Sequence, residues 1–252
     1  MIKRIALLTL LVAPLWLSAQ VRTEKLLEKG WKFTREDNPE FKTSQFDDTK
    51  WQSVCIPHDW AIYGPFSINN DKQNTAIVQD GQKEAMEHAG RTGGLPFVGT
   101  GWYRLRFDVP EYTDGKKCTL VFDGAMSHAR VYINGKEACF WPFGYNSFHC
   151  DVTGLLNADG KNNVLAVRLE NRPQSSRWYP GAGLYRNVHL VTTERVHVPV
   201  WGTQLTTPHV SAEYASVRLR TTIRNAGDAD VRISTDIIAP DGKIVARKDN
   251  SR

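Results

Sequence analysis

The sequence predicts an all-β protein, in which a jelly-roll (galactose-binding-like) β-sandwich is followed by an incomplete immunoglobulin-like β-sandwich. Apolar residues recur at every second position over many short stretches from residue 54 onward. Turn-forming dipeptides separate these stretches, and helical patterns are almost absent. Many short strands with turns between them are typical of an antiparallel sandwich or jelly roll.

The first unit is predicted over residues 20–193. In its clearest strand Tyr103, Leu105 and Phe107 alternate with polar or charged residues, so one face of the strand is apolar. Asn134-Gly135 lies between two alternating runs and tolerates the positive φ angles of a type I′ turn, which predicts a β-hairpin. Further strands are predicted within residues 118–122, 129–140, 162–171 and 187–198.

A second unit is predicted over residues 194–252. The runs "SVRLRTTIRN", "ADVRISTDII" and "KIVARK" indicate three strands separated by turns. An immunoglobulin-like sandwich needs about seven strands and roughly 100 residues. Three strands leave side chains such as Val217, Leu219 and Ile233 without an opposing sheet, so we expect this unit to be truncated.

Residues 1–19 have the pattern of a secretory signal peptide. Lys3 and Arg4 precede an apolar run from Ile5 to Leu17, and Ala19 ends a small-residue exit. The run is shorter than the roughly 20 residues that a membrane-spanning helix needs. We therefore expect an exported protein, periplasmic or extracellular, with no membrane span after cleavage.

The charge pattern argues against a nucleic-acid partner. The formal net charge is +5, and cleavage would lower it to +3 by removing two cations. The remaining Lys and Arg residues are interleaved with acids, which is typical of a solvated surface. Glu87, His88, His128 and His149 have no metal-ligand spacing, so we expect neither a metal nor a cofactor in this chain.

The cysteines are Cys55, Cys118, Cys139 and Cys150, and their spacing matches no zinc pattern. Each lies in an apolar or strand-like stretch, where a free thiol behaves as a small hydrophobe, and this is the interpretation that we favour. Export would permit disulfides, and Cys139 with Cys150 would then close a short loop.

The stretch "PHDW" contains an adjacent histidine and aspartate. A catalytic pair needs a hydrogen bond between base and orienting group, but neighbouring side chains on a strand point apart. We favour a structural corner, with Trp60 in the core and Asp59 accepting hydrogen bonds from backbone amides. A catalytic role for His58 and Asp59 is the weaker alternative.

Several motifs occur in an order that resembles a known family. They are "KGWKF", "FDDTKWQSVCIPHDWAIYGPF", "GGLPFVGTGWYRLRFDVP", "VYINGKEACFWPFGYNSFHCDVTGLL" and "SRWYPGAGLYRNVHL". Together they resemble the N-terminal sugar-binding domain of glycoside hydrolase family 2, which includes β-galactosidases, β-glucuronidases and β-mannosidases. The forms "PHDW" and "RWYPGAGLYR" look most like the β-galactosidase branch.

The resemblance implies a jelly roll, an immunoglobulin-like domain and then a (β/α)₈ barrel that carries two catalytic glutamates. Retaining glycosidases need two carboxyl groups about 5–5.5 Å apart. The implied glutamates lie beyond residue 252, so this chain is expected to be inactive alone and to support the barrel during hydrolysis of terminal β-galactosides. β-Glucuronides and β-mannosides are alternative substrates. A stand-alone carbohydrate-binding module and a cell-surface structural module remain alternative functions.

The loop before residue 181 is a candidate sugar contact. Arg177 and Trp178 combine hydrogen-bond donors with an aromatic plate, which suits the hydroxyl rim and the apolar face of a sugar. Pro180 fixes φ, and Gly181 and Gly183 permit backbone conformations that other residues resist, so we expect the turn to hold the loop rigid. Packing of Trp178 against the next domain is the alternative.

Asn146 is a second candidate for a β-galactoside or related oligosaccharide. Its place in "FWPFGYNSFHCDVT" resembles a β-galactosidase loop that lends a polar side chain to the galactose pocket, although better-known enzymes have an aspartate there. Capping of a turn through its own backbone is the alternative. Trp141, Phe143 and Tyr145 would either line a sugar platform or fill the core.

Overall fold

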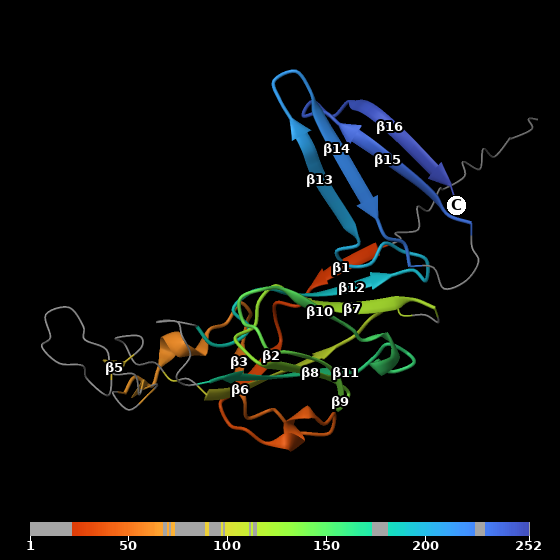
Figure 1. The fold of residues 1–252 in the computed structure, drawn as a ribbon. Helices are drawn as coiled ribbons and strands as arrows, with labels where there is room; N and C mark the ends of the chain where they lie inside the picture. The colour runs from red at the N-terminus through yellow and green to blue at the C-terminus, as the bar shows by residue number, and fades with distance from the viewer. Residues whose placement is uncertain are drawn as a thin grey trace, which may run out of the picture.

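The computed structural model describes residues 22–67, 70, 72–73, 89–90, 97, 99–110, 112, 115–172, 181–224 and 230–251. The predicted signal peptide therefore lies outside the described residues. Strands dominate this part of the chain, and they form a β-sandwich followed by two β-hairpins (Figure 1). The all-β prediction is confirmed.

Ten described strands form the sandwich, and two further strands, β4 and β5, form a separate pair. The strands up to residue 193 are β1 (Arg22–Leu26), β2 (Trp31–Thr34), β3 (Gln52–Val54), β4 (Lys72–Gln73), β5 (Ala89–Gly90), β6 (Gly99–Phe107), β7 (Lys117–Phe122), β8 (Ala129–Ile133), β9 (Lys136–Trp141), β10 (Phe148–Asp151), β11 (Asn163–Asn171) and β12 (Val188–Thr193). The 3-10 turns are η1 (Pro39–Lys42), η2 (Trp60–Tyr63) and η3 (Thr153–Leu155). No helix among the described residues is long and apolar enough to cross a membrane.

Two antiparallel sheets form the layers of the sandwich. One has the strand order β1-β12-β7-β10, and the other has the order β3-β2-β6-β11-β8-β9. The predicted Asn134-Gly135 turn joins β8 to β9, and both residues adopt positive φ. β4 and β5 pair separately with each other.

The core lies between the two layers, where the apolar positions of the alternating strands meet. Tyr103 and Leu105 of β6 face Leu120 and Phe122 of β7 across this core, and all four are at most 5% exposed. The predicted alternation therefore places these apolar side chains on the inner face of the sandwich, because successive side chains of a strand point to opposite faces.

The other face of β6 is also covered, which the alternation did not predict. The segment around η1 packs beneath the six-stranded sheet, and Phe41 contacts Trp102 edge-on at 5.8 Å (Figure 1). Arg104 is fully buried there and donates to Asp48 Oδ2 at 2.7 Å and to the carbonyl oxygen of Thr43 at 3.0 Å. A buried guanidinium needs such partners because desolvating an unpaired charge is very costly.

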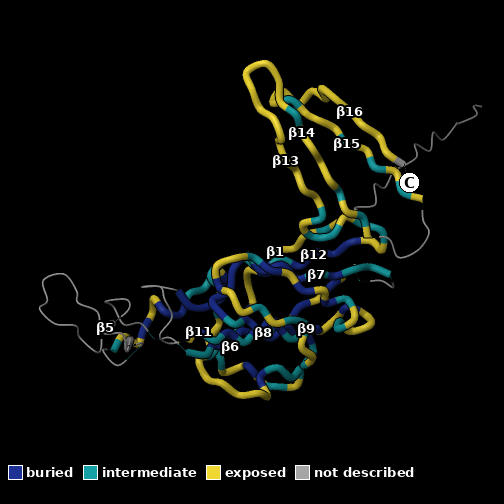
Figure 2. Tube along the Cα trace, in the orientation of Figure 1, coloured by how far each residue is buried: buried dark blue, intermediate teal, exposed yellow. Residues whose placement is uncertain are grey.

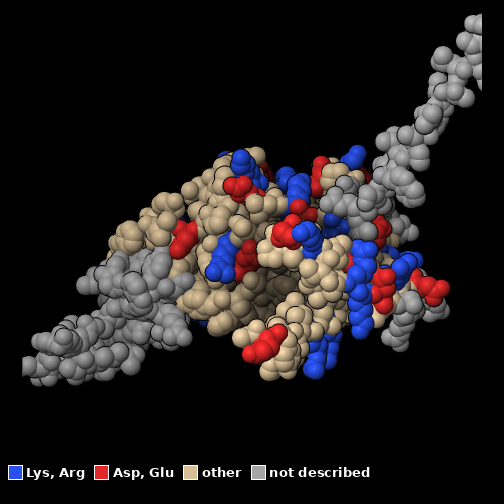
Figure 3. All heavy atoms as spheres, turned by 90° about the horizontal axis from the view of Figure 1, so that it is seen from above, with Lys and Arg blue, Asp and Glu red and all other residues tan. Residues whose placement is uncertain are grey.

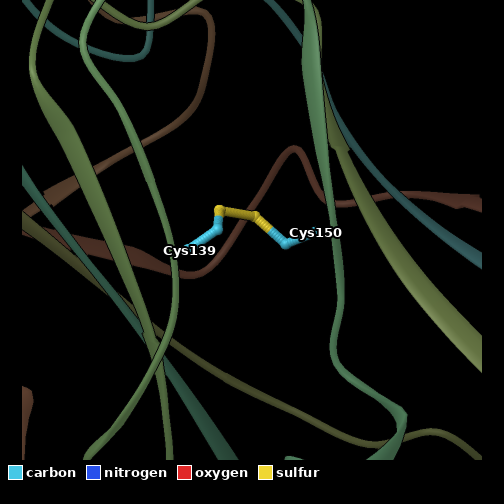
Figure 4. Close-up of a disulfide and its surroundings, with 2 residues drawn as sticks. All are labelled: Cys139 and Cys150. Atoms are coloured by element: carbon cyan, nitrogen blue, oxygen red, sulfur yellow. A yellow bond between two sulfur atoms is a disulfide. The ribbon is translucent and has the colours of Figure 1, made fainter.

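Cys139 and Cys150 form a disulfide, so our preference for free thiols at these two positions was wrong (Figure 4). Cys139 lies on β9 and Cys150 on β10, and their Cα atoms are 5.9 Å apart. β9 and β10 are edge strands of different sheets. The packing of one sheet on the other, and not the sequence spacing, brings the two thiols together. Cys55 and Cys118 are free, as expected.

The chain continues from β12 into two hairpins. They consist of β13 (Thr203–Val210) with β14 (Ala215–Thr221), and β15 (Arg232–Ile238) with β16 (Ile244–Ser251). Figure 2 shows burial concentrated in the sandwich, whereas the hairpins are largely exposed. Leu205, Val217 and Ile238 expose 63%, 52% and 62% of their surfaces, so their apolar area lacks cover from the described residues. The immunoglobulin-like assignment of residues 194–252 stays a prediction.

Replacing both disulfide cysteines with alanine should lower the free energy of unfolding by up to about 3 kcal/mol. The disulfide spans a sequence separation of 11 residues, and closing a loop of this size restricts the unfolded chain by about that amount. Urea unfolding with and without reductant measures the loss, with Cys55→Ala as the exposed-thiol control. A double variant as stable as the parent under oxidising conditions would contradict the assignment.

Asp48→Ala should destabilise the protein by about 3 kcal/mol, because it leaves the buried Arg104 without its carboxylate partner. Asp47→Ala removes a neighbouring carboxylate that is fully exposed, and it should shift the unfolding midpoint much less. Thermal and urea unfolding of both variants test this difference. Equal unfolding midpoints for the two variants would show that the ion pair between Asp48 and Arg104 does not stabilise the segment around η1.

Candidate functional site

The "PHDW" stretch forms a structural corner, as favoured from the sequence. Trp60 is 2% exposed and stacks on Phe33 of β2 at 5.5 Å, which buries the end of the stretch in the core. The Asp59 carboxylate accepts hydrogen bonds from the backbone N–H groups of Ala61 at 2.9 Å and Ala182 at 2.8 Å. Asp59 therefore caps η2 and links it to a distant part of the chain.

Residues 58–60 and 182–184 form what we call the corner clamp. The N–H of His58 donates to the carbonyl of Leu184 at 2.8 Å, and the N–H of Trp60 donates to the carbonyl of Ala182 at 2.9 Å. Gly183 has a φ of +124°, and a Cβ there would lie 2.4 Å from the His58 carbonyl oxygen and 2.5 Å from the Tyr103 hydroxyl. Glycine is required because any side chain would force the two segments apart.

The loop that carries Arg177 and Trp178 lies outside the described residues, so their predicted sugar contacts stay predictions. Both flanks of the loop are described. Asn171 at the end of β11 is 2% exposed, and its side-chain amide donates to the carbonyl of Gly181 at 2.7 Å. Gly181 has a φ of +70°, in agreement with the conformational role predicted for it. The two flanks are thus tied to each other and to the corner clamp.

Asn146 lies on an exposed loop next to the same region. Its side-chain oxygen accepts a hydrogen bond from the indole N–H of Trp141 at 2.9 Å, so the predicted cap on its own backbone is not the bond that the structure shows. Tyr185 reaches this loop by donating its hydroxyl proton to the carbonyl of Gly144 at 2.6 Å. Phe143 is 54% exposed, so the loop presents an aromatic surface and does not bury this ring in the core.

A pocket of ≈ 410 Å³ opens beside the clamp, and we call it the corner pocket. It lies within the size range of small-molecule sites. Tyrosine rings and polar groups line it together. The lining residues are Gln52, Ser53, Val54, Cys55, Pro57, His58, Asp59, Ile62, Tyr63 and Tyr185.

His58 connects the corner pocket to the core. Its Nδ1 lies 2.7 Å from the hydroxyl of Tyr103, a fully buried residue of β6. Burial lowers the pKa of the His58 imidazole, although the nearby Asp59 carboxylate opposes this effect, so the neutral ring is favoured. Burial also raises the pKa of the Tyr103 phenol well above its ordinary value, and the hydroxyl keeps its proton.

The described residues of the corner pocket offer hydrogen-bonding groups and aromatic rings. Asp59 is the one carboxylate among the described residues of the corner pocket, and its oxygen already holds backbone amides. Within the described ranges, no three His, Cys, Asp or Glu side chains are placed to hold a metal ion. On the face seen in Figure 3, cationic and anionic side chains are interspersed. The sequence predicted the corner but not the corner pocket. The residues that line this pocket come from β3, from η2 and from the segment after residue 184, and only the folded chain brings them together.

Comparison with known proteins identifies the chain's relatives. A family model described as "Glycosyl hydrolases family 2, sugar binding domain" matches residues 24–194. The β-galactosidase BoGH2A of Bacteroides ovatus is 37% identical over 224 residues, which cover 88% of this chain and 24% of that protein.

Solved structures agree with this comparison. A glycosyl hydrolase family 2 member from Bacteroides cellulosilyticus superposes with a TM-score of 0.78 at 30% identity, over 91% of this chain and 28% of that one. A Bacteroides uniformis β-glucuronidase superposes with a TM-score of 0.73 at 26% identity, over 92% of this chain and 26% of that one. The chain thus spans about a quarter of the length of these relatives.

Asp59→Ala should lower the free energy of unfolding by about 3 kcal/mol, because the N–H groups of Ala61 and Ala182 lose their acceptor in the interior. Asp59→Asn keeps an acceptor oxygen at the same place and should retain most of this stability. Urea unfolding of the two variants provides the measurement. Equal losses for both would show that the carboxylate's charge, not its acceptor oxygen, holds the clamp.

Proposed function

The chain belongs to glycosyl hydrolase family 2, and from that premise we propose that it is the non-catalytic N-terminal portion of an exported retaining β-glycosidase. In the whole enzyme it supports a (β/α)₈ barrel and forms one wall of the substrate pocket. The observation that carries the proposal is the corner clamp inside the matched sugar-binding domain. The clamp fixes residues 182–184, which follow the loop proposed to contact the sugar, and Asp59 is the one carboxylate among the described residues of the corner pocket.

The proposed substrate is a terminal β-galactoside. The support is the 37% identity to a protein named as a β-galactosidase, together with the "PHDW" and "RWYPGAGLYR" forms. A β-glucuronide is the second candidate, because a β-glucuronidase superposes on 92% of the chain. Fold alone does not separate the two sugars, since specificity depends on the groups that contact the substrate.

Exposed aromatic side chains near the corner clamp support a large partner on this side. Tyr63 and Phe66 follow the corner, and they expose 73% and 61% of their surfaces. Phe143 and Tyr145 expose 54% and 46%, and their rings lie 5.6 Å apart on the loop that Tyr185 contacts. Such rings gain free energy when another surface covers them, and the proposed partner is the catalytic barrel.

Arg177, Trp178 and Asn146 are the proposed sugar contacts of this wall. The tie between Asn171 and Gly181 holds both ends of the loop that carries the first two residues. The Asn146 side-chain oxygen accepts from Trp141, and no described residue accepts from its N–H₂ group, which could donate to a sugar hydroxyl. We also propose that the protein is exported from the cytoplasm, because residues 1–19 have the pattern of a signal peptide.

The proposal is tested by expressing the whole encoded protein and, separately, residues 20–252. The whole protein should hydrolyse nitrophenyl β-galactoside faster than the β-glucuronide and the β-mannoside, with retention of anomeric configuration. Residues 20–252 should be inactive on all three, because both catalytic glutamates are proposed to lie beyond residue 252. Activity of the purified shorter chain, or no glycosidase activity in the whole protein, would overturn the proposal.

Arg177→Ala in the whole enzyme should lower kcat/KM roughly 10- to 100-fold. This range corresponds to about 1.5–3 kcal/mol for the loss of a charge-assisted hydrogen bond to the substrate. The unfolding midpoint should stay close to that of the parent. Arg232→Ala, on an exposed hairpin strand, is the matched control. Parental kinetics in Arg177→Ala would assign this loop to packing alone.

A further inference from the structure

We propose that Trp141 is a positioning residue for the Asn146 sugar contact, and that its indole N–H turns the Asn146 amide so that the N–H₂ group meets a substrate oxygen. This inference rests on the proposed function and deepens it. It assigns a role to Trp141, for which the sequence left both a sugar platform and a core position open. The substrate oxygen that binds here then acts as the acceptor.

The loop of residues 142–147 is closed at its base by a covalent bond and an aromatic contact. The disulfide between Cys139 and Cys150 joins the two strands that the loop connects (Figure 4). Closer to the loop, the ring of Trp141 stacks on the ring of Phe148, with the centroids 5.7 Å apart and the planes 11° apart. Phe148 is 2% exposed, so this base attaches the indole to the core of the sandwich.

The loop is also held on both sides of Asn146. Before it, the backbone N–H of His128 donates to the carbonyl of Pro142 at 3.1 Å. After it, the hydroxyl of Ser147 donates to the carbonyl of Asp123 at 3.1 Å. These contacts restrict the backbone but not the amide group of Asn146, because the terminal torsion of an asparagine has broad preferences.

The hydrogen bond from Trp141 fixes this last torsion. The indole nitrogen lies 2.9 Å from Oδ1 of Asn146. An indole N–H can only donate, so the amide oxygen and not the amide nitrogen must face it. The oxygen and the nitrogen share one carbon atom, and fixing the first therefore also fixes the direction of the N–H₂ group.

The fixed orientation determines the chemistry of the contact. A freely rotating asparagine offers a sugar either its carbonyl oxygen or its N–H₂ donors, whereas Asn146 held by Trp141 offers the donors. A hydroxyl or ring oxygen of the sugar accepts this hydrogen bond. Binding also costs less conformational entropy, because the side chain is ordered before the sugar arrives.

Steady-state kinetics of the whole enzyme on nitrophenyl β-galactoside test the assignment. Asn146→Ala should raise KM about 3- to 10-fold, the value of one neutral hydrogen bond, with kcat within about twofold of the parent. Trp141→Phe removes the N–H but keeps a ring against Phe148, and it should raise KM about 2- to 5-fold because the amide is no longer oriented. Combined with Asn146→Ala, Trp141→Phe should add no further increase, because Trp141 acts only through Asn146.

Two further variants separate positioning from packing. Trp141→Leu also removes the ring, so it should match Trp141→Phe in KM while lowering the unfolding midpoint further. Trp201→Phe, at an indole that is 57% exposed on a different segment, is the matched control and should behave as the parent. A parental KM in Asn146→Ala or in Trp141→Phe, increases that multiply in the double variant, or a much larger KM in Trp141→Leu than in Trp141→Phe would overturn the assignment.

Calorimetry distinguishes failure of this inference from failure of the proposed function. Hydrolysis by the whole protein with a parental KM in the variants rejects the inference and leaves the proposed function standing. If the whole protein hydrolyses no glycoside, the proposed function fails, and binding of methyl β-galactoside is measured directly on the parent and the variants. Dissociation constants that rise in both single variants without a further rise in the double variant support the positioning role, whereas independent effects or no binding reject it.

Discussion

The region proposed to face the substrate depends on hydrogen bonds between two segments that are 123 residues apart in sequence. His58 and Trp60 donate their backbone N–H groups to the 182–184 segment, and Asp59 accepts the N–H of Ala182 in return. These groups are partly or fully buried, where an unpaired amide is costly, so the segments hold each other in one arrangement. Gly183 permits the contact because it has no Cβ.

The clamp is positioned by β6, a strand inside the six-stranded sheet. Its inner face presents Tyr103 to His58, and its outer face presents Arg104 to Asp48 and the carbonyls of the η1 segment. β6 therefore contacts both His58, which lines the corner pocket, and the η1 segment, which covers the outer face of the sheet. The disulfide between β9 and β10 joins the two sheets at one edge, so both layers are fixed relative to each other. This rigidity suits the supporting role that we propose for the sandwich.

We propose that the barrel of the whole enzyme carries the catalytic groups and that the sandwich supports the substrate pocket. Glycoside hydrolysis needs two closely spaced carboxyl groups, and barrel enzymes place such groups at the ends of barrel strands. A β-sandwich contributes rigid loops, and here those loops carry aromatic rings and polar side chains around the corner pocket. Rigid loops of this kind suit the proposed role of a wall beside the substrate pocket of the barrel.

Local sequence determined the elements whose signals are short in range. Alternation predicted β6 and β11, Asn134-Gly135 predicted the turn between β8 and β9, and the motif order predicted the family that the comparisons show. "PHDW" was also correctly read as a corner, because capping by an aspartate is a local interaction.

Tertiary structure alone decided the burial of Arg104, the pairing of Cys139 with Cys150 and the contact between His58 and Tyr103. Each joins groups that are remote in sequence or lie on different sheets. Such contacts depend on how the layers pack, and the period of a single strand holds no information about which residues the opposite layer will present.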